Sequence, residues 1–145
     1  MFVLDTNVVS ELRKIRAGKA DRRVAQWADA MDAGSLHISA ISVLELEMGV
    51  LQIERRDPTQ GAMLRTWLET RLLPEFDGRT LSVDATVARR CARLHVPDPR
   101  AARAALIAAT ALVHGMTVVT RNFADFAAMG VPLLNPWDGS VGRAE

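Results

Sequence analysis

At 145 residues the chain is about the size of one domain, long enough to bury a hydrophobic core. Its net charge of +1 argues against nucleic-acid binding through bulk electrostatics and leaves only a local basic face for such contacts. A single cysteine excludes an internal disulfide and a thiolate zinc cluster and suits a reducing cytosol, and neither a membrane span nor a signal-peptide pattern is present. We therefore predict one cytoplasmic domain over residues 1–145.

Strands and helices are expected to alternate along the whole chain. Phe2-Val3-Leu4 is a short apolar run without a helical period, which reads as a buried strand, and Asp5-Thr6-Asn7 reads as the turn into a helix. Ser42 and Glu45 have the spacing of a capping box at the start of a helix over about 43–55. The expected strands are 2–4, 36–39, 80–83, 117–120 and 131–134, and the expected helices are 8–12, 24–31, 43–55, 58–72, 85–94, 100–114 and 123–129. This order predicts an α/β fold with a mainly parallel sheet of about five strands covered by helices on both faces.

Three acidic residues lie just after predicted strands. Asp5 ends the first strand, Glu45 follows the second by about one helical turn, and Asp125 follows the strand at 117–120, with Asn122 at its cap. Because the carboxyl ends of parallel strands meet at one edge of a sheet, these side chains are expected to converge. Clustered carboxylates repel unless a cation lies between them, and hard oxygen ligands without His or Cys suit Mg²⁺ or Mn²⁺. A metal site of this kind supports phosphodiester hydrolysis.

Two of the three acids also have simpler explanations. Glu45 could only complete its capping box, and Asp125 could only complement the positive end of its helix. Asp5 is harder to explain as a structural residue, because an acid at the end of a buried strand costs stability unless something pairs with it. Arg121 is a candidate for that partner, or for a contact to a phosphate group.

Taken together, these stretches resemble the PIN-domain family, specifically the VapC-type, FitB-like toxins of bacterial toxin–antitoxin pairs. The matching stretches occur in family order and span nearly the whole chain. They are Val3-Leu4-Asp5-Thr6-Asn7, Ser42-Val43-Leu44-Glu45-Leu46 with Gly49, Leu106-Ile107-Ala108-Ala109-Thr110-Ala111, Val119-Thr120-Arg121-Asn122 with Asp125-Phe126, and Asn135-Pro136-Trp137.

The resemblance implies a Mg²⁺-dependent endoribonuclease toxin that acts on RNA such as tRNA or rRNA. It also implies a homodimer neutralised by a small VapB-like antitoxin. The toxin is then expected to reach operator DNA only through this antitoxin. The family's acids map onto Asp5, Glu45 and the Asn122/Asp125 region. Thr6, Asn7 and Thr120 are then expected to support the metal ligands, and Arg121 to contact a phosphate.

One position departs from the family pattern. An aspartate normally stands two residues before the Leu-Ile-Ala-Ala-Thr-Ala run, and Ala104 occupies that place here. Removing one carboxylate from a small oxygen cage weakens its hold on a metal ion. We therefore expect impaired catalysis.

A catalytically inactive protein that acts by binding its antitoxin and supporting operon repression is the alternative. The apolar helix over 43–55 favours it, because such a helix offers a surface for a partner. A phosphoacceptor receiver-like domain and a nucleotide-binding domain are less favoured, because the first would need a further acid and a lysine and the second a glycine-rich loop.

Overall fold

The computed structural model describes residues 1–143, and its centre is a six-stranded sheet in the order β3-β2-β1-β4-β5-β6. All neighbouring strands are parallel except β5 and β6, which run antiparallel. The strands are β1 (Phe2–Leu4), β2 (Leu36–Ser39), β3 (Thr80–Leu81), β4 (Thr117–Val119), β5 (Pro132–Leu134) and β6 (Val141–Arg143). The predicted α/β fold with a mainly parallel sheet is confirmed.

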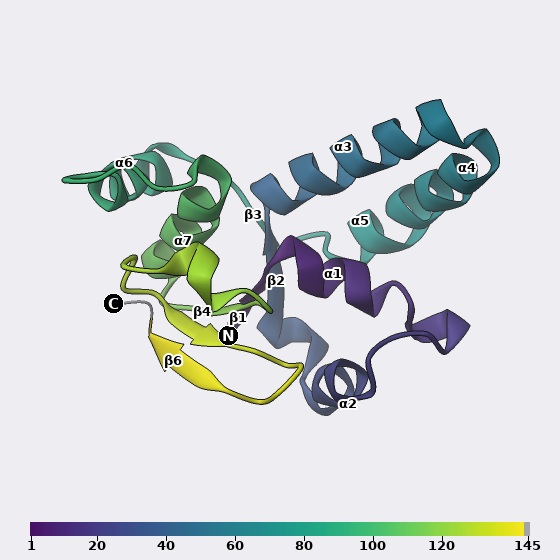
Figure 1. The fold of residues 1–145 in the computed structure, drawn as a ribbon, viewed down its shortest axis with the longest axis horizontal. Helices are drawn as coiled ribbons and strands as arrows, with labels where there is room; N and C mark the ends of the chain where they lie inside the picture. The colour runs from purple at the N-terminus through teal and green to yellow at the C-terminus, as the bar shows by residue number, and fades with distance from the viewer. Residues whose placement is uncertain (144–145) are drawn as a thin grey trace.

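Helices lie on both sides of this sheet (Figure 1). The α-helices are α1 (Thr6–Leu12), α2 (Arg22–Ala30), α3 (Ala40–Arg56), α4 (Pro58–Trp67), α5 (Leu73–Glu75), α6 (Ala85–Leu94) and α7 (Ala102–His114). A π-helical stretch, Leu68–Leu72, joins α4 to α5, and short 3-10 turns lie at Ile15–Ala17, Ala33–Ser35 and Phe123–Phe126. No helix in residues 1–143 has the length and apolar character needed to cross a membrane.

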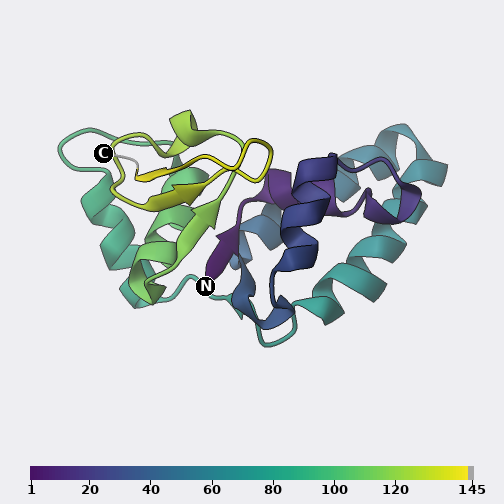
Figure 2. The same cartoon turned by 90° about the horizontal axis from the view of Figure 1, so that it is seen from below.

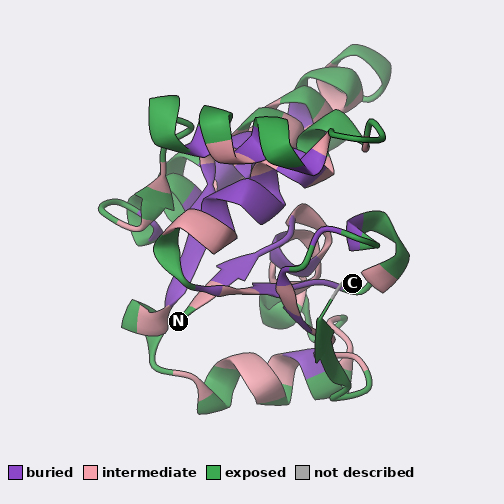
Figure 3. Ribbon diagram, turned by 90° about the vertical axis from the view of Figure 1, so that its left-hand side faces the viewer, coloured by how far each residue is buried: buried purple, intermediate pink, exposed green. Residues whose placement is uncertain are grey.

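The sheet separates two hydrophobic cores, which lie on its opposite faces (Figure 2). Successive side chains of a strand point to opposite faces, so Val3 packs with α6 and α7 while Leu4 packs with the group formed by α1, α3 and the α4–α5 segment. Val118 and Val119 divide between the two cores in the same way. The central strands are consequently buried along most of their length (Figure 3).

Helix α3 begins earlier than the sequence pattern predicts. Ser39, the last residue of β2, is the N-cap, and its hydroxyl accepts a hydrogen bond of 3.0 Å from the Ile41 amide. Ser42 therefore lies inside the first turn and is fully buried. The predicted capping box between Ser42 and Glu45 is wrong, because a strand ending in serine supplies the cap three residues before it.

The C-terminal region differs most from expectation. The segment predicted as a helix over 123–129 is the 3-10 turn Phe123–Phe126, and β3 spans only two residues. The sixth strand, β6, was not predicted, because Val141-Gly142-Arg143 is exposed and has no apolar alternation. It forms through backbone pairing to β5, after the chain reverses between Asn135 and Ser140.

Candidate functional site

Asp5 stands where β1 passes into α1, and the fold holds it rigidly. Its backbone amide donates to the Val119 carbonyl at 2.8 Å, which continues the sheet by one residue. Its side chain caps α1, with Oδ1 accepting from the Thr6 amide at 2.8 Å. Oδ2 accepts from the Thr120 hydroxyl at 2.8 Å and from Asn7 Nδ2 at 3.3 Å. Only 9% of the residue is exposed, so this carboxylate is buried among neutral donors.

Burial raises the pKa of Asp5 above its usual value, since a charged carboxylate is disfavoured away from water. The hydrogen bonds from Thr120 and Thr6 oppose this effect, because they favour the ionised form. The negative charges of Glu45 and Asp125 add to the rise in pKa. Both acids are therefore near enough for their charges to act on Asp5, as expected from their positions after neighbouring strands.

Glu45 is linked to Asp5 through Thr6. The Thr6 hydroxyl donates to Glu45 Oε1 at 2.9 Å, and its amide donates to Asp5. The same hydroxyl oxygen lies 3.1 Å from the hydroxyl of Ser42, which stands one turn before Glu45 on α3. Ser42 was interpreted from the sequence only as a helix cap. Its i, i+3 spacing from Glu45 was the signal for a shared face, and only the true start of α3 shows which face that is.

Thr120 organises the side of the site formed by the end of β4. It is fully buried, donates to Asp5 Oδ2, and accepts from the Asn122 amide at 3.1 Å. Asn7 Nδ2 lies 3.5 Å from the same hydroxyl, and Asn7 Oδ1 accepts from the Arg121 amide at 3.4 Å. The turn after β4 is thus tied to the turn after β1.

Asp125 lies in the 3-10 turn after β4 and is exposed. Its amide donates to the Asn122 carbonyl at 3.2 Å, and the Asn122 side chain caps nothing. Asp125 therefore reaches Asp5 through its charge and not through a hydrogen bond between their side chains. Within residues 1–143 no group of three or more His, Cys, Asp or Glu side chains is arranged closely enough to hold a metal ion.

The first turn of α7 brings Arg103 and Ala104 to the same region. Arg103 Nε lies 3.6 Å from Glu45 Oε2, and its guanidinium also contacts the sulfur of Met48 on α3. Ala104 packs at the edge of the core, and the first turn of α7 contains no acidic side chain. The positively charged Arg103 therefore lies beside Glu45. The family pattern has an acid at the next position, which is Ala104 in this chain.

Arg121 does not pair with Asp5, whose close partners are Thr120, Thr6 and Asn7. Its guanidinium instead stacks on the Trp137 ring, 5.0 Å from the ring centroid. The Asn135 side chain donates to the Arg121 carbonyl at 3.3 Å. The sequence suggested Arg121 as a counter-ion, but the buried hydroxyl of Thr120 takes that place.

Comparison with known proteins identifies the family of this fold. The family model for the PIN domain matches residues 2–131. The chain belongs to the PIN-domain family. It is 37% identical to the VapC ribonuclease Y4jK of Sinorhizobium fredii, over 95% of this chain and 99% of that one. It is 38% identical to the toxin FitB of Neisseria gonorrhoeae, over 94% of this chain and 99% of the other.

A solved structure supports the same placement within the PIN-domain family. The crystal structure of FitAcB from Neisseria gonorrhoeae contains a chain that matches with a TM-score of 0.84 at 36% identity, covering 94% of this chain and 99% of that chain. The predicted resemblance to VapC-type and FitB-like toxins is therefore confirmed, and with it the PIN-like fold.

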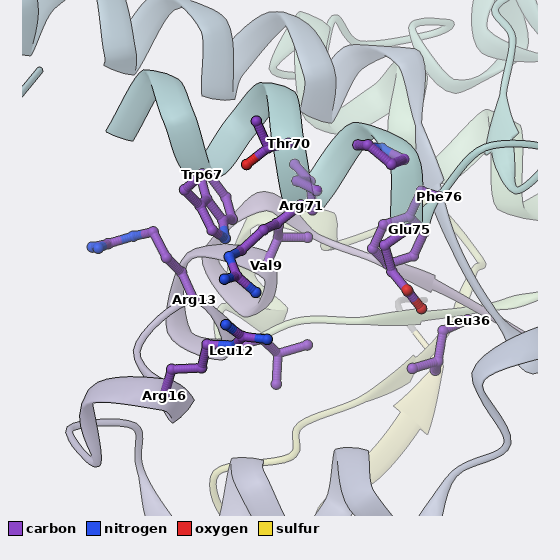
Figure 4. A pocket seen from close by; sticks show the side chains of 12 residues that line it. Val9, Leu12, Arg13, Arg16, Leu36, Trp67, Thr70, Arg71, Glu75 and Phe76 are labelled. Atoms are coloured by element: carbon purple, nitrogen blue, oxygen red, sulfur yellow. The ribbon is translucent and has the colours of Figure 1, made fainter. Parts of the chain in front are cut away.

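A cavity of this PIN domain lies away from the acids, between α1 and the segment that joins α4 to α5 (Figure 4). Its volume is about 580 Å³, and its walls are mainly apolar with several arginines. Arg13 stacks on the Trp67 ring there, 5.9 Å from the ring centroid. None of the acids discussed above lines it, so the cavity is separate from the acidic site.

Proposed function

We propose that this PIN-domain protein is a VapC-type toxin, a Mg²⁺-dependent endoribonuclease that cleaves cellular RNA such as tRNA. The observation that carries the proposal is the link from Asp5 through Thr6 to Glu45 at the carboxyl edge of the sheet. Two carboxylates from distant parts of the chain are brought together there. One of them, Asp5, is buried, which costs free energy of folding that hydrophobic packing does not return.

The side-chain oxygens at this edge suit a hard divalent ion as ligands, since they are carboxylate, hydroxyl and amide oxygens. Asp5 and Glu45 would hold Mg²⁺ or Mn²⁺, with Asp125 acting through its charge or an intervening water. The raised pKa of Asp5 supports this assignment, because a nearby cation would restore the ionised form. When bound, such an ion lowers the pKa of a coordinated water and stabilises the oxygen that leaves phosphorus.

The other residues have distinct proposed roles. Glu45, with 27% of its side chain exposed, is proposed to accept a proton from the attacking water. Thr6, Asn7 and Thr120 orient the two carboxylates through the hydrogen bonds described above, while Asn122 is fixed through its backbone amide. Arg121, exposed at the mouth of the turn, is proposed to contact a phosphate of the RNA.

Activity is proposed to be impaired in this chain because Ala104 replaces a family aspartate. The structure supports this in two ways: the first turn of α7 lies beside Glu45, and its nearest charged side chain is Arg103, which is positive. An aspartate at position 104 would add a negative charge at a helix N-terminus, where it is electrostatically favoured. Restoring it should therefore strengthen the metal site without unfolding the helix.

Calorimetric titration with Mn²⁺ tests the metal site directly. We expect Ala104→Asp to bind Mn²⁺ at least about tenfold more tightly than the unchanged chain, which corresponds to about 1.4 kcal/mol. Glu45→Gln in the Ala104→Asp background should remove that gain. Cleavage of a broad RNA panel should rise in parallel with Mn²⁺ affinity. Equal and negligible binding and cleavage in all forms would contradict the proposal.

The proposed partners are a VapB-like antitoxin, operator DNA through that antitoxin, and a second copy of this chain in the cytoplasm. Relatives support the first two: a solved structure of FitAB bound to a DNA fragment contains a chain that matches this one at 35% identity and a TM-score of 0.84. A surface for protein contacts exists on α3, where Leu44, Met48 and Leu51 are exposed along one stripe. A sedimentation experiment on the isolated chain tests the homodimer.

The same stripe favours a second function, that of a catalytically inactive protein that holds its antitoxin and supports repression of the operon. This surface does not depend on an intact metal site, and Arg103 already compensates part of the charge of Glu45. Tight co-purification with a small antitoxin, together with no Mn²⁺ binding by the unchanged chain, would favour this reading. Stoichiometric Mn²⁺ binding would argue for the nuclease.

A further inference from the structure

The basic charge of this chain is concentrated in one segment. Residues 85–103 contain five arginines and one aspartate, a net charge of +4, although the whole chain carries only +1. The remainder of the chain is therefore negative by three charges. The segment comprises α6, the connection 95–101 and the first turn of α7, and Figure 1 shows α6 and α7 side by side.

Three arginines on α6 have no partner among residues 1–143 that would give them a structural role. Among residues 1–143, neither an ion pair nor a side-chain hydrogen bond involves Arg89, Arg90 or Arg93. By contrast, Arg65 is surrounded by three glutamates, and Arg79 donates to backbone carbonyls.

Helix stability does not account for the three arginines either. Arg89 and Arg93 stand four residues apart, a spacing at which like charges destabilise a helix. Arg93 lies in the last turn, where the helix dipole favours a cation, but Arg89 and Arg90 lie before it.

The three arginines line a cavity of about 440 Å³ between α6 and the C-terminal half of α7. Its lining residues are Thr86, Arg89, Arg90, Ala92, Arg93 and Val113, so no acidic side chain contributes to it. A concave surface lined by guanidinium groups and short side chains suits a phosphate backbone, because each guanidinium can donate two hydrogen bonds to one phosphate.

The segment that carries the basic surface leads along the chain to the acidic site. The end of α6 is tied to the start of α7, because His95 Nδ1 accepts from the Arg100 amide at 3.1 Å. Three residues later, Arg103 reaches Glu45. From Ala104 to Val113 the axis of α7 advances about 14 Å, at 1.5 Å per residue. A ligand that touches both surfaces must therefore be longer than one nucleotide.

We propose that the arginine surface of α6, formed by Arg89, Arg90 and Arg93, binds the phosphate backbone of the RNA substrate outside the acidic site. This inference rests on the proposed ribonuclease function. The surface adds affinity for RNA of several nucleotides and reads no base sequence, since phosphate contacts carry little sequence information. An acidic protein segment is the rival occupant, and the experiment separates the two.

Fluorescence anisotropy without divalent ions measures RNA binding apart from cleavage. The test variant is Arg89→Gln/Arg93→Gln, and the matched control is Arg55→Gln/Arg56→Gln, which removes two exposed charges at the end of α3. Each protein is titrated with an RNA of about 20 nucleotides, a trinucleotide and a polyglutamate peptide. Circular dichroism and urea midpoints establish that both variants fold like the unchanged chain.

We expect the α6 variant alone to lose affinity for the longer RNA. With two phosphate contacts removed, the plot of log affinity against log salt should become less steep by about 1.4. The difference in affinity between the unchanged chain and the variant should therefore shrink by about 25-fold over a tenfold rise in salt. Trinucleotide binding should fall by a smaller factor than binding of the longer RNA, because a trinucleotide offers few phosphates to the arginines.

Two results would overturn the inference. An equal loss in both double variants would mean that only total charge matters. Loss of polyglutamate binding with unchanged RNA binding would assign the surface to an acidic protein segment. The ribonuclease proposal is tested separately by cleavage of a short RNA with the Ala104→Asp form, which does not need α6.

Discussion

The hydroxyl of Thr120 offers a direct test of how the acidic site is held together. It is fully buried and donates to Asp5 Oδ2 at 2.8 Å. Thr120→Val keeps the side-chain shape and removes this donor, so a buried carboxylate loses one of its hydrogen bonds; it also removes the acceptor for the amide of Asn122, an exposed residue. A hydrogen bond to a charged group contributes roughly 1.5–3 kcal/mol, and for a chain of this size that corresponds to a fall in Tm of roughly 4–10 °C.

The effect should depend on pH with a definite sign. Burial raises the pKa of Asp5, so the folded protein holds that proton more tightly than the unfolded chain does. The associated stability is present below the unfolded pKa and is lost as pH rises through the folded pKa. Thr120→Val removes a contact that favours the ionised form, so its cost should be larger at pH 7 than at pH 4, by about 1 kcal/mol.

Urea denaturation across this pH range measures both quantities, and Thr110→Val is the matched control. Thr110 is also fully buried, but its hydroxyl donates only to the Leu106 carbonyl within α7. Its replacement should cost less than about 1 kcal/mol at every pH, because that carbonyl already belongs to the helix. A cost for Thr120→Val that equals the control, or that does not change with pH, would contradict this account of Asp5.

Asp5→Asn should raise the urea midpoint at pH 7 in metal-free buffer, since it removes a buried charge, and should abolish Mn²⁺ binding; a lower midpoint would contradict this. Gly61→Ala should destabilise by about 1–3 kcal/mol, because the new Cβ would lie 2.5 Å from the Glu54 Cα. Gly49→Ala, which meets nothing within 4 Å, should instead stabilise α3 by up to about 1 kcal/mol. Ala104→Asp should leave the metal-free free energy of unfolding, measured with urea, within about 0.5 kcal/mol or raise it, and a larger loss would argue against room for the family acid.

The sequence by itself determined the fold class and the principal acids. Alternation of short apolar runs with amphipathic segments predicted a parallel sheet between two layers of helices. In such a sheet the residues after parallel strands share one edge, so the sequence alone predicts that Asp5 and Glu45 lie together. These inferences depend only on local periodicity and on the handedness common to all such folds.

Only the tertiary structure decided how those residues interact. It made Ser39 the cap of α3 and so moved Ser42 into the site, and it gave Thr120 the place beside Asp5 that the sequence suggested for Arg121. It also brought Arg89, Arg90 and Arg93 of α6 to line one cavity. Hydrogen-bond partners across a sheet are chosen by distance and burial between segments far apart in the chain, and local sequence patterns contain neither quantity.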